Sequence, residues 1–135
     1  MKNILSLLIL LCGISSCTKA PRLVEVDKGY SSTSVNTTIF RNSSLASFER
    51  KQYIAYYDAE GWMVIGSRLL NEDTWTLKRS QYKGNVKDAH NVISLMVDGE
   101  GYLHVAFDHH GHPLNYCRSV APHSLELGEK ESMTG

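Results

Sequence analysis

Short runs of alternating apolar and polar residues follow one another from residue 34 onward, and no helical period of comparable length interrupts them. In one such run Leu103, Val105 and Phe107 occupy every second position, which places them on one face of a strand. The pattern predicts strands at Ser34–Phe40, Gln52–Asp58, Met63–Leu69, Trp75–Gln81, Val92–Asp98, Leu103–Asp108 and Leu114–Arg118.

The segments between these strands carry turn signals rich in Gly, Asn, Asp and Pro. The clearest are Ala59-Glu60-Gly61, Asn71-Glu72-Asp73, Asp98-Gly99-Glu100-Gly101 and His110-Gly111-His112-Pro113. Evenly spaced short strands with such turns predict an all-β fold, either a sandwich, a barrel or a propeller.

A repeat favours the propeller. Shifting the chain by about 50 residues, the length of a four-stranded blade, aligns similar residues. The aligned pairs include Asp58 with Asp108, Gly61 with Gly111, Val64 with Leu114 and Arg68 with Arg118. We therefore expect about two four-stranded antiparallel blades, the second ending in residues 132–135 without a closing strand. Because a propeller closes with roughly 4 to 8 blades, we expect this chain to be a truncated piece of one.

The hairpin around Asp98–Gly101 gives the strongest indication of a site. If this turn is tight, antiparallel pairing places His90 and His110 opposite each other, with Cβ atoms roughly 4.5–8 Å apart. Two imidazoles at one strand end can bind a carboxylate, and near neutral pH either can move a proton. His90 and His110 are therefore the candidate catalytic residues.

Neighbouring residues have two interpretations each. Asn91 is a candidate ligand for a sugar hydroxyl or a turn residue. His109 is a candidate substrate-binding residue, but His109 and His104 are more commonly explained as hydrogen-bonded structural histidines. Alternation along the strand predicts that His109 and His110 point in different directions. His112 precedes Pro113 and is expected to shape the turn.

A metal cluster at His109-His110-Gly111-His112 is the alternative for this turn. Adjacent histidines seldom bind one ion without a carboxylate or Cys from elsewhere, so no metal site is predicted. His123 lies in a loop and supports no hypothesis. The repeat of Asp58 as Asp108 predicts that both aspartates form turns.

The N-terminal segment has the organisation of an export signal. A basic start at Lys2 precedes an apolar core, Ile4–Cys12, which is too short to span a bilayer because that takes about 20 residues. Ile14-Ser15-Ser16-Cys17 resembles the lipobox of bacterial lipoproteins, which implies that residues 1–16 are removed and Cys17 is lipidated. The alternative is an ordinary signal peptide cleaved near the same residues.

This organisation predicts a flexible tether at residues 17–33 and a partial propeller at residues 34–135. It also predicts a lipid-anchored protein of the bacterial cell envelope, on the periplasmic side or at the outer-membrane surface.

The composition of the chain disfavours several classes of binding partner and reactive site. The chain has 14 basic and 14 acidic residues, so its charge does not favour nucleic acid or an acidic surface. Three cysteines are too few for a disulfide framework, and Cys117 is expected to be a buried, inert thiol. No Gly-x-Ser-x-Gly nucleophile motif occurs, the pattern places no close carboxylate pair, and no cofactor is predicted.

The central segment also resembles a known family. Three stretches carry the resemblance: Asp88-Ala89-His90-Asn91, residues 97–105 (VDGEGYLHV) and residues 108–114 (DHHGHPL). They are similar to the BNR-repeat-containing propeller proteins of bacterial polysaccharide utilisation, a group that includes the ulvan lyase families. The sialidase Asp-box is echoed only partly, by residues 72–75, so the sequence does not support a sialidase.

This resemblance implies that residues 30 to 135 form the N-terminal part of a seven-bladed propeller acting by β-elimination on a uronate-containing polysaccharide. His90 and His110 would be its active-site histidines. The family's catalytic Tyr and carboxylate-binding Arg would lie further along the propeller than residue 135. We therefore expect a lipid-anchored polysaccharide lyase-like fragment, inactive alone, whose partners are an acidic polysaccharide and, through the anchor, the membrane.

Two alternatives remain. One is a non-catalytic glycan-binding propeller lipoprotein, in which the histidines and four aromatic side chains form a sugar platform; the aromatic residues are Tyr53, Tyr56, Tyr57 and Trp62. The other is a piece that folds only with a partner half. The same aromatic residues are also typical of packing within and between blades.

Overall fold

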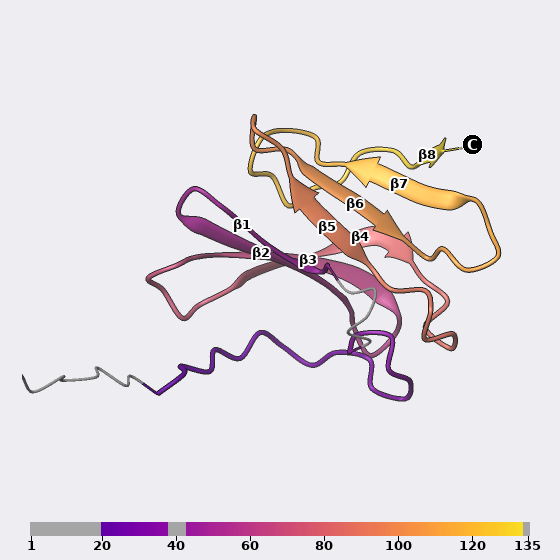
Figure 1. The fold of residues 1–135 in the computed structure, drawn as a ribbon, viewed down its shortest axis with the longest axis horizontal. Coiled ribbons are helices and arrows are strands. Elements are labelled where there is room, and N and C mark those ends of the chain that lie inside the picture. The colour runs from indigo at the N-terminus through magenta and orange to yellow at the C-terminus, as the bar shows by residue number, and fades with distance from the viewer. Residues whose placement is uncertain (1–19, 38–42, 134–135) are drawn as a thin grey trace, which may run out of the picture.

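The structure, a computed structural model, describes residues 20–37 and 43–133 and consists of two four-stranded antiparallel sheets. The first sheet contains β1 (Leu45–Phe48), β2 (Lys51–Tyr57), β3 (Trp62–Leu69) and β4 (Thr76–Lys83). The second contains β5 (Ser94–Val97), β6 (Leu103–Phe107), β7 (Leu114–Arg118) and β8 (Glu131–Met133). Each sheet is a meander in chain order, and the two lie across each other (Figure 1). The prediction of two four-stranded antiparallel blades is confirmed.

The predicted strands from Gln52 to Arg118 are all present, but both ends of the strand pattern were predicted wrongly. Within Ser34–Phe40, residues 34–37 form a turn in which Thr37 N–H donates to Ser34 O over 2.8 Å, and residues 38–40 lie outside the described residues. The first strand is β1 instead. The second sheet does have a closing strand, β8, which pairs with β7 through Leu114 and Met133.

The β5–β6 hairpin has the predicted register, with Ser94 opposite Ala106 and Val97 opposite Leu103. Asp98 stabilises its turn, because Asp98 Oδ1 accepts hydrogen bonds from the backbone N–H groups of Glu100 and Tyr102, both over 2.9 Å. Gly101 follows with a φ of 86°, a conformation that glycine adopts without strain. The local chemistry of this turn therefore fixes the register that aligns the two strands.

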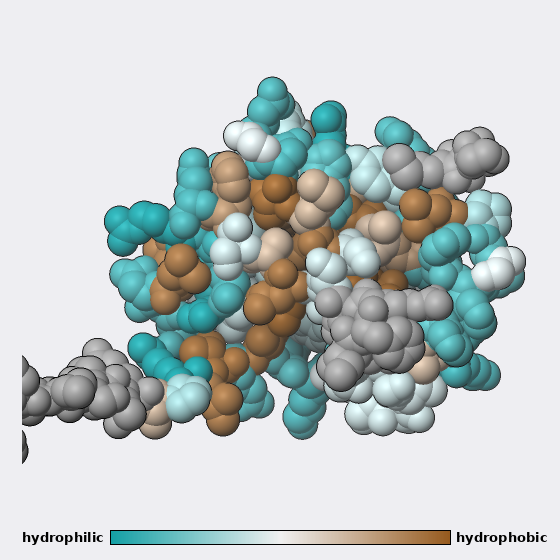
Figure 2. Space-filling view, viewed as in Figure 1, coloured by the Kyte–Doolittle hydropathy of each residue, from teal (hydrophilic) through white to brown (hydrophobic). Residues whose placement is uncertain are grey.

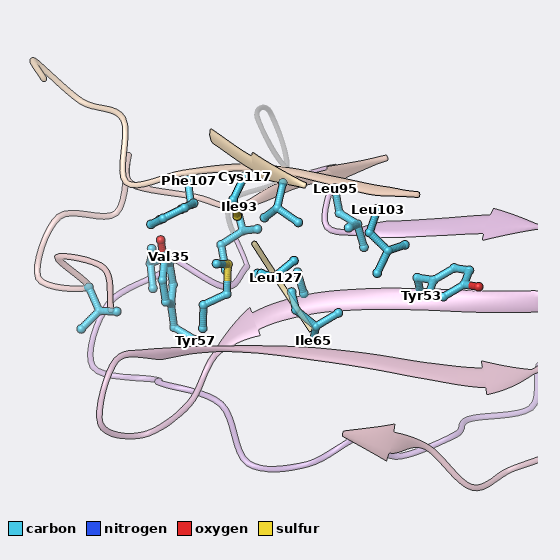
Figure 3. Packing of buried hydrophobic residues seen from close by; sticks show 14 residues of the cluster. Val35, Tyr53, Tyr57, Ile65, Ile93, Leu95, Leu103, Phe107, Cys117 and Leu127 are labelled. Atoms are coloured by element: carbon cyan, nitrogen blue, oxygen red, sulfur yellow. The ribbon is translucent and has the colours of Figure 1, made fainter. Parts of the chain in front are cut away.

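One apolar core lies between the sheets (Figure 3). Leu103, Val105 and Phe107 enter it from the second sheet, and Phe107 contacts Tyr82 of β4 with ring centroids 5.3 Å apart. From the first sheet, the hydroxyl of the buried Tyr53 hydrogen-bonds Nδ1 of His123 over 2.9 Å. The core therefore joins the two sheets into one packed unit.

The residue alignment within the repeat differs from the predicted one. A shift of about 50 residues pairs Tyr57 with Phe107, yet both side chains enter the core between the sheets. Successive blades related by rotation must present opposite faces to each other. The equivalence therefore runs one residue further on, pairing Ala55 with Ala106 and Ile65 with Tyr116. The two hairpins have the same length, since Ala55 pairs with Ile65 and Ala106 pairs with Tyr116, although pairing between β2 and β3 continues closer to the turn.

The other face of the second sheet is open in the described part of the molecule. Met96 is 58% exposed there, and a depression of about 320 Å³ lies nearby. Its lining includes Met96, His104, Ala106, Leu114 and Tyr116. Hydrophobic side chains lie among hydrophilic ones on the surface seen in Figure 2. By the corrected repeat, this face corresponds to the face of the first sheet that the second sheet covers.

The N-terminal segment runs along the first sheet (Figure 1, indigo). Tyr30 N–H donates to Tyr57 O over 2.8 Å, and the Thr33 hydroxyl donates to Val86 O over 2.6 Å. The end of the predicted tether therefore packs on the blade. The signal peptide and Cys17 lie outside the described residues. Within residues 20–37 and 43–133, no helix is long and apolar enough to cross a membrane.

Cys117 lies in the core, fully buried, and burial raises the pKa of its thiol to about 12. The thiolate is the reactive form of cysteine. We therefore expect Ellman's reagent at about pH 8 to leave Cys117 unlabelled in a folded variant with Cys12 and Cys17 replaced by Ser. The same variant unfolded in guanidinium should release one equivalent of chromophore. Labelling at equal rates in both states would contradict the burial of this thiol.

Candidate active site

The two predicted histidines come together at the end of the β5–β6 hairpin opposite the Asp98 turn. His90 lies in the loop before β5, and His110 lies in the turn between β6 and β7. Their ring centroids are 4.3 Å apart, with an interplanar angle of 33°. Both side chains are about half exposed, at 47% and 48%. The predicted juxtaposition of the two imidazoles is therefore present in the structure.

An aspartate that was not predicted as a site residue joins them. Asp88 Oδ1 lies 2.8 Å from His90 Nδ1, and Asp88 Oδ2 lies 2.6 Å from His110 Nδ1. Asp88 Oδ1 also accepts the His90 backbone N–H over 2.9 Å, which forms a local turn. The sequence signal was an Asp two residues before a His, a spacing typical of such turns. We call Asp88, His90 and His110 the Asp–His–His cluster.

Hydrogen bonding sets the charge of this cluster. The bond from His110 holds the pKa of Asp88 well below its usual range, and the backbone and side-chain bonds from His90 lower it further. A hydrogen bond from His104 similarly lowers the pKa of Asp98 at the other end of the hairpin. Both carboxylates are therefore ionised at neutral pH and act only as acceptors.

These lowered pKa values predict the behaviour of both groups in acid. A carboxyl group with a lowered folded-state pKa stabilises the fold above its unfolded pKa of about 3.9, and that stabilisation is lost as pH falls through the folded value. In carbon-detected NMR we expect the carboxyl carbons of Asp88 and Asp98 to titrate below the ordinary aspartate pKa of about 3.9. The same carboxyl carbons in the urea-unfolded chain serve as the reference. Ordinary midpoints for Asp88 and Asp98 would contradict the histidine contacts.

Asp108 fixes the two loops beside each other. Its Oδ1 accepts the Asn85 backbone N–H over 2.8 Å, and its carbonyl accepts Asn115 Nδ2–H over 3.1 Å. Asp108 has a φ of 51°, which is uncommon for a residue with a side chain. The prediction that Asp108 repeats the turn of Asp58 was wrong, because its carboxylate reaches a different loop. Asp58 does form the local turn, by accepting Glu60 N–H over 2.9 Å.

Asn91 lies inside the loop and not at its surface. It is 1% exposed, and its Nδ2–H donates to Asn85 O over 3.2 Å. Its Oδ1 is buried without a hydrogen-bond partner in the described part of the chain. This position favours the turn interpretation over direct contact with a sugar hydroxyl.

The remaining histidines have local partners. His109 Nδ1 donates to His112 O over 2.9 Å, so His109 stabilises the turn. His104 lies between Tyr116 OH, 2.6 Å from Nδ1, and Asp98 Oδ2, 2.9 Å from Nε2. The structural interpretation of His104 is therefore confirmed. His123, which supported no hypothesis, connects the sheets through Tyr53.

A pocket of about 150 Å³ lies beside the cluster. Its lining consists of His90, Val92, Ser94, Ala106, Phe107, His109 and Leu114. Ligand pockets usually measure about 300–1,000 Å³, so this one accommodates one group of a larger ligand. His109 lines this pocket while its Nδ1 is engaged in the turn, and its role in substrate binding stays a prediction.

The predicted aromatic sugar platform does not form. Tyr53 and Tyr57 are fully buried in the core, and Tyr56 is buried on the other face of β2. Trp62 is partly exposed, but Lys83 Nζ lies 5.3 Å from its ring centroid. The packing interpretation of the three tyrosines is therefore confirmed.

One set of described residues could hold a metal ion. Asp88, His90 and His110 each offer one ligand atom, and these atoms lie within 4.8 Å of one another. Of the turn considered for metal binding from the sequence, only His110 belongs to this set. Both Nδ1 atoms already contact the Asp88 carboxylate, so an ion bound through them would replace two hydrogen bonds.

Comparison with known proteins agrees with this architecture. Residues 51–135 match the model of a BNR repeat-containing family member. A solved structure of an ulvan lyase from a new polysaccharide lyase family, bound to -[GlcA(1-4)Rha3S]-, superposes with a TM-score of 0.61 at 17% identity. That match covers 78% of this chain and 28% of the lyase chain.

A second structure of such an ulvan lyase superposes with a TM-score of 0.53, also at 17% identity, and covers 79% of this chain and 28% of that one. The chain thus spans about a quarter of the length of these structures. Among curated proteins none matches it.

Proposed function

This chain belongs to the BNR repeat-containing family, and from that premise we propose that it is the N-terminal part of a polysaccharide lyase-like protein that binds uronate-containing polysaccharide. The observation that carries the proposal is the pair of half-exposed imidazoles, with ring centroids 4.3 Å apart, beside a small pocket that His90 lines. The propeller fold shared with an ulvan lyase bound to a glucuronate-containing oligosaccharide supports the class of ligand.

The proposed chemistry is β-elimination. A base takes the proton from C5 of the uronate, a double bond forms between C4 and C5, and the C4–O bond breaks. The leaving oxygen takes a proton, so atoms and charge balance. Neutral imidazole can accept the C5 proton, and imidazolium can donate to the uronate carboxylate or to the leaving oxygen, which are the roles we assign to His90 and His110.

Binding without turnover is the second candidate for this chain. Among the described residues that line the pocket there is no tyrosine, arginine or lysine. Charge neutralisation and acid–base catalysis contribute about 10² to 10⁴ each, so the two histidines alone should turn over substrate slowly. Residues elsewhere in the propeller would supply these groups in the lyase proposal.

Binding of an acidic oligosaccharide tests the proposal. We expect the chain to bind a sulfated glucuronate–rhamnose oligosaccharide, measured by calorimetry, and not a neutral oligosaccharide of equal length. His90→Ala and His110→Ala should each weaken binding about tenfold or more, since a hydrogen bond to a charged group is worth about 1.5–3 kcal/mol. His112→Ala is the control, because only the backbone carbonyl of His112 contacts His109.

Ultraviolet absorbance of the unsaturated uronate distinguishes the two candidates. The lyase-like function is supported if the protein binds the oligosaccharide, the absorbance grows slowly, and His90→Ala abolishes that growth. Binding without absorbance supports the glycan-binding function. Equal binding by the wild type, both histidine variants and the control would show that His90 and His110 do not bind the oligosaccharide.

We also propose that the protein is anchored in the bacterial cell envelope through a lipidated Cys17. The support is the apolar core Ile4–Cys12 followed by the lipobox-like residues 14–17. Growth with an alkyne-labelled fatty acid should label the wild type, and Cys17→Ser should remove the label while Cys12→Ser keeps it. Label that persists in Cys17→Ser would exclude this anchor.

A further inference from the structure

Asp88 is placed differently from an ordinary turn-forming aspartate. Its two carboxylate oxygens are divided between two imidazoles, with Oδ1 on His90 Nδ1 and Oδ2 on His110 Nδ1. Within the described part of the chain, the Nε2 atoms of both rings make no protein hydrogen bond. The carboxylate therefore contacts the same nitrogen of each ring and leaves the opposite nitrogen open.

The chemistry of the carboxylate determines where the ring hydrogens are. An ionised carboxylate only accepts hydrogen bonds, so each Nδ1 must carry a hydrogen to make its contact. A neutral imidazole carries one ring hydrogen, which leaves a lone pair on Nε2. Among the described residues of the two loops, no other group accepts a hydrogen bond from these Nδ1 atoms. Without the carboxylate, nothing would therefore favour the Nδ1–H tautomer.

We infer that Asp88 is a positioning residue: it holds His90 and His110 together in the Nδ1–H tautomer, so that two Nε2 atoms face one acidic sugar ligand. The inference rests on the proposed function for its ligand, but the tautomer it assigns is independent of that function. Each Nε2 accepts a proton when its ring is neutral and donates one when its ring is protonated. One anion thereby orients both groups that the proposed chemistry requires.

The other end of the same hairpin provides an internal comparison. Asp98 also forms a local turn and also contacts a histidine, since its Oδ2 lies 2.9 Å from His104 Nε2. There the second ring nitrogen is occupied by Tyr116 OH over 2.6 Å. His104 therefore has both nitrogens engaged, as expected of a structural histidine, and His90 and His110 do not.

Imidazole nitrogen NMR tests the inference directly in the full chain. At a pH where the rings are neutral, long-range proton–nitrogen spectra should show the hydrogen on Nδ1 in both His90 and His110. Asp88→Ser retains a turn-forming oxygen near the His90 N–H but cannot reach two rings. In this variant we expect both rings to shift to the Nε2–H tautomer, which predominates in free histidine. Unchanged tautomers would overturn the inference.

Asp88→Asn is the second variant, because its Oδ1 preserves the turn at the His90 N–H. Its amide nitrogen accepts no hydrogen bond, so at most one ring can keep the Nδ1–H tautomer. Asp98→Ser is the matched control, and it should alter the His104 signals alone. Two unchanged rings in Asp88→Asn would likewise count against the assignment.

Oligosaccharide binding separates this inference from the proposed function. If the wild type binds the glucuronate-containing oligosaccharide, Asp88→Ser should weaken binding about tenfold, as expected for the loss of one oriented charge-assisted hydrogen bond. A changed tautomer with unchanged affinity would refute the positioning role. A wild type with both Nδ1–H tautomers that binds no uronate would refute the proposed function and leave the assignment of Asp88 standing.

Discussion

Leu103→Ala should lower the free energy of unfolding by about 2–5 kcal/mol, the range for Leu-to-Ala changes in well-packed cores. Leu103 is fully buried between the two sheets, at the start of β6 (Figure 3). Its N–H donates to Ser119 Oγ over 3.0 Å, so hydrogen bonds hold the backbone and a cavity would not close easily. Urea denaturation followed by tryptophan fluorescence and by circular dichroism measures the change.

Met96→Ala is the matched control, since Met96 lies on the neighbouring strand β5 but is 58% exposed. Substitutions at exposed positions usually change stability by less than about 0.5 kcal/mol. Equal losses in the two variants would mean that the face carrying Leu103 is no better packed than the open face, which would contradict the shared core.

Gly84→Ala should cost about 1–3 kcal/mol, as expected for overpacking in a tight interior. A Cβ at Gly84 would lie 2.5 Å from the ring and hydroxyl of Tyr57, which is fully buried and cannot retreat. The loop that follows Gly84 carries Asn85, whose N–H is held by Asp108. We therefore expect the variant to lose stability in urea and also to shift the NMR signals of His90.

Gly99→Ala is the control for this substitution, because nothing lies within 4 Å of a Cβ built there. Gly99 is also at a turn, so the two variants share the change in unfolded-state entropy that follows from replacing glycine. A Gly84→Ala protein as stable as Gly99→Ala, with unshifted His90 signals, would contradict the close contact with Tyr57.

The fold was predictable where local chemistry determines it. Alternation at Leu103, Val105 and Phe107 identified a half-buried strand, and the Asp98–Gly101 turn fixed the hairpin register. The first and last strands were missed for different reasons. In β1 the outward-facing Leu45 is apolar yet 53% exposed, so the sequence does not alternate between apolar and polar residues, and β8 has only three residues. Their pairing depends on neighbours that a single sequence does not display.

The site was predictable to the same extent. The register argument brought His90 and His110 together, because antiparallel pairing extends beyond the strand ends. Asp88 was missed because one aspartate near a histidine is common, and only the loop geometry gives each carboxylate oxygen a separate ring. Asn91 and Asp108 were assigned by type, whereas their burial and long-range contacts decide their roles.

The meander order of both sheets has a consequence for the sequence of events during synthesis. Each strand pairs with the strand made just before it, so the first sheet can form once residue 83 has left the ribosome. The contacts between the sheets come later in the chain, as in Tyr53 with His123 and Gln81 with Leu127. Because local contacts form faster than distant ones, we expect the first sheet to form first and the second sheet to pack on it afterwards. The histidine pair would then be set only after β6 has paired with β5.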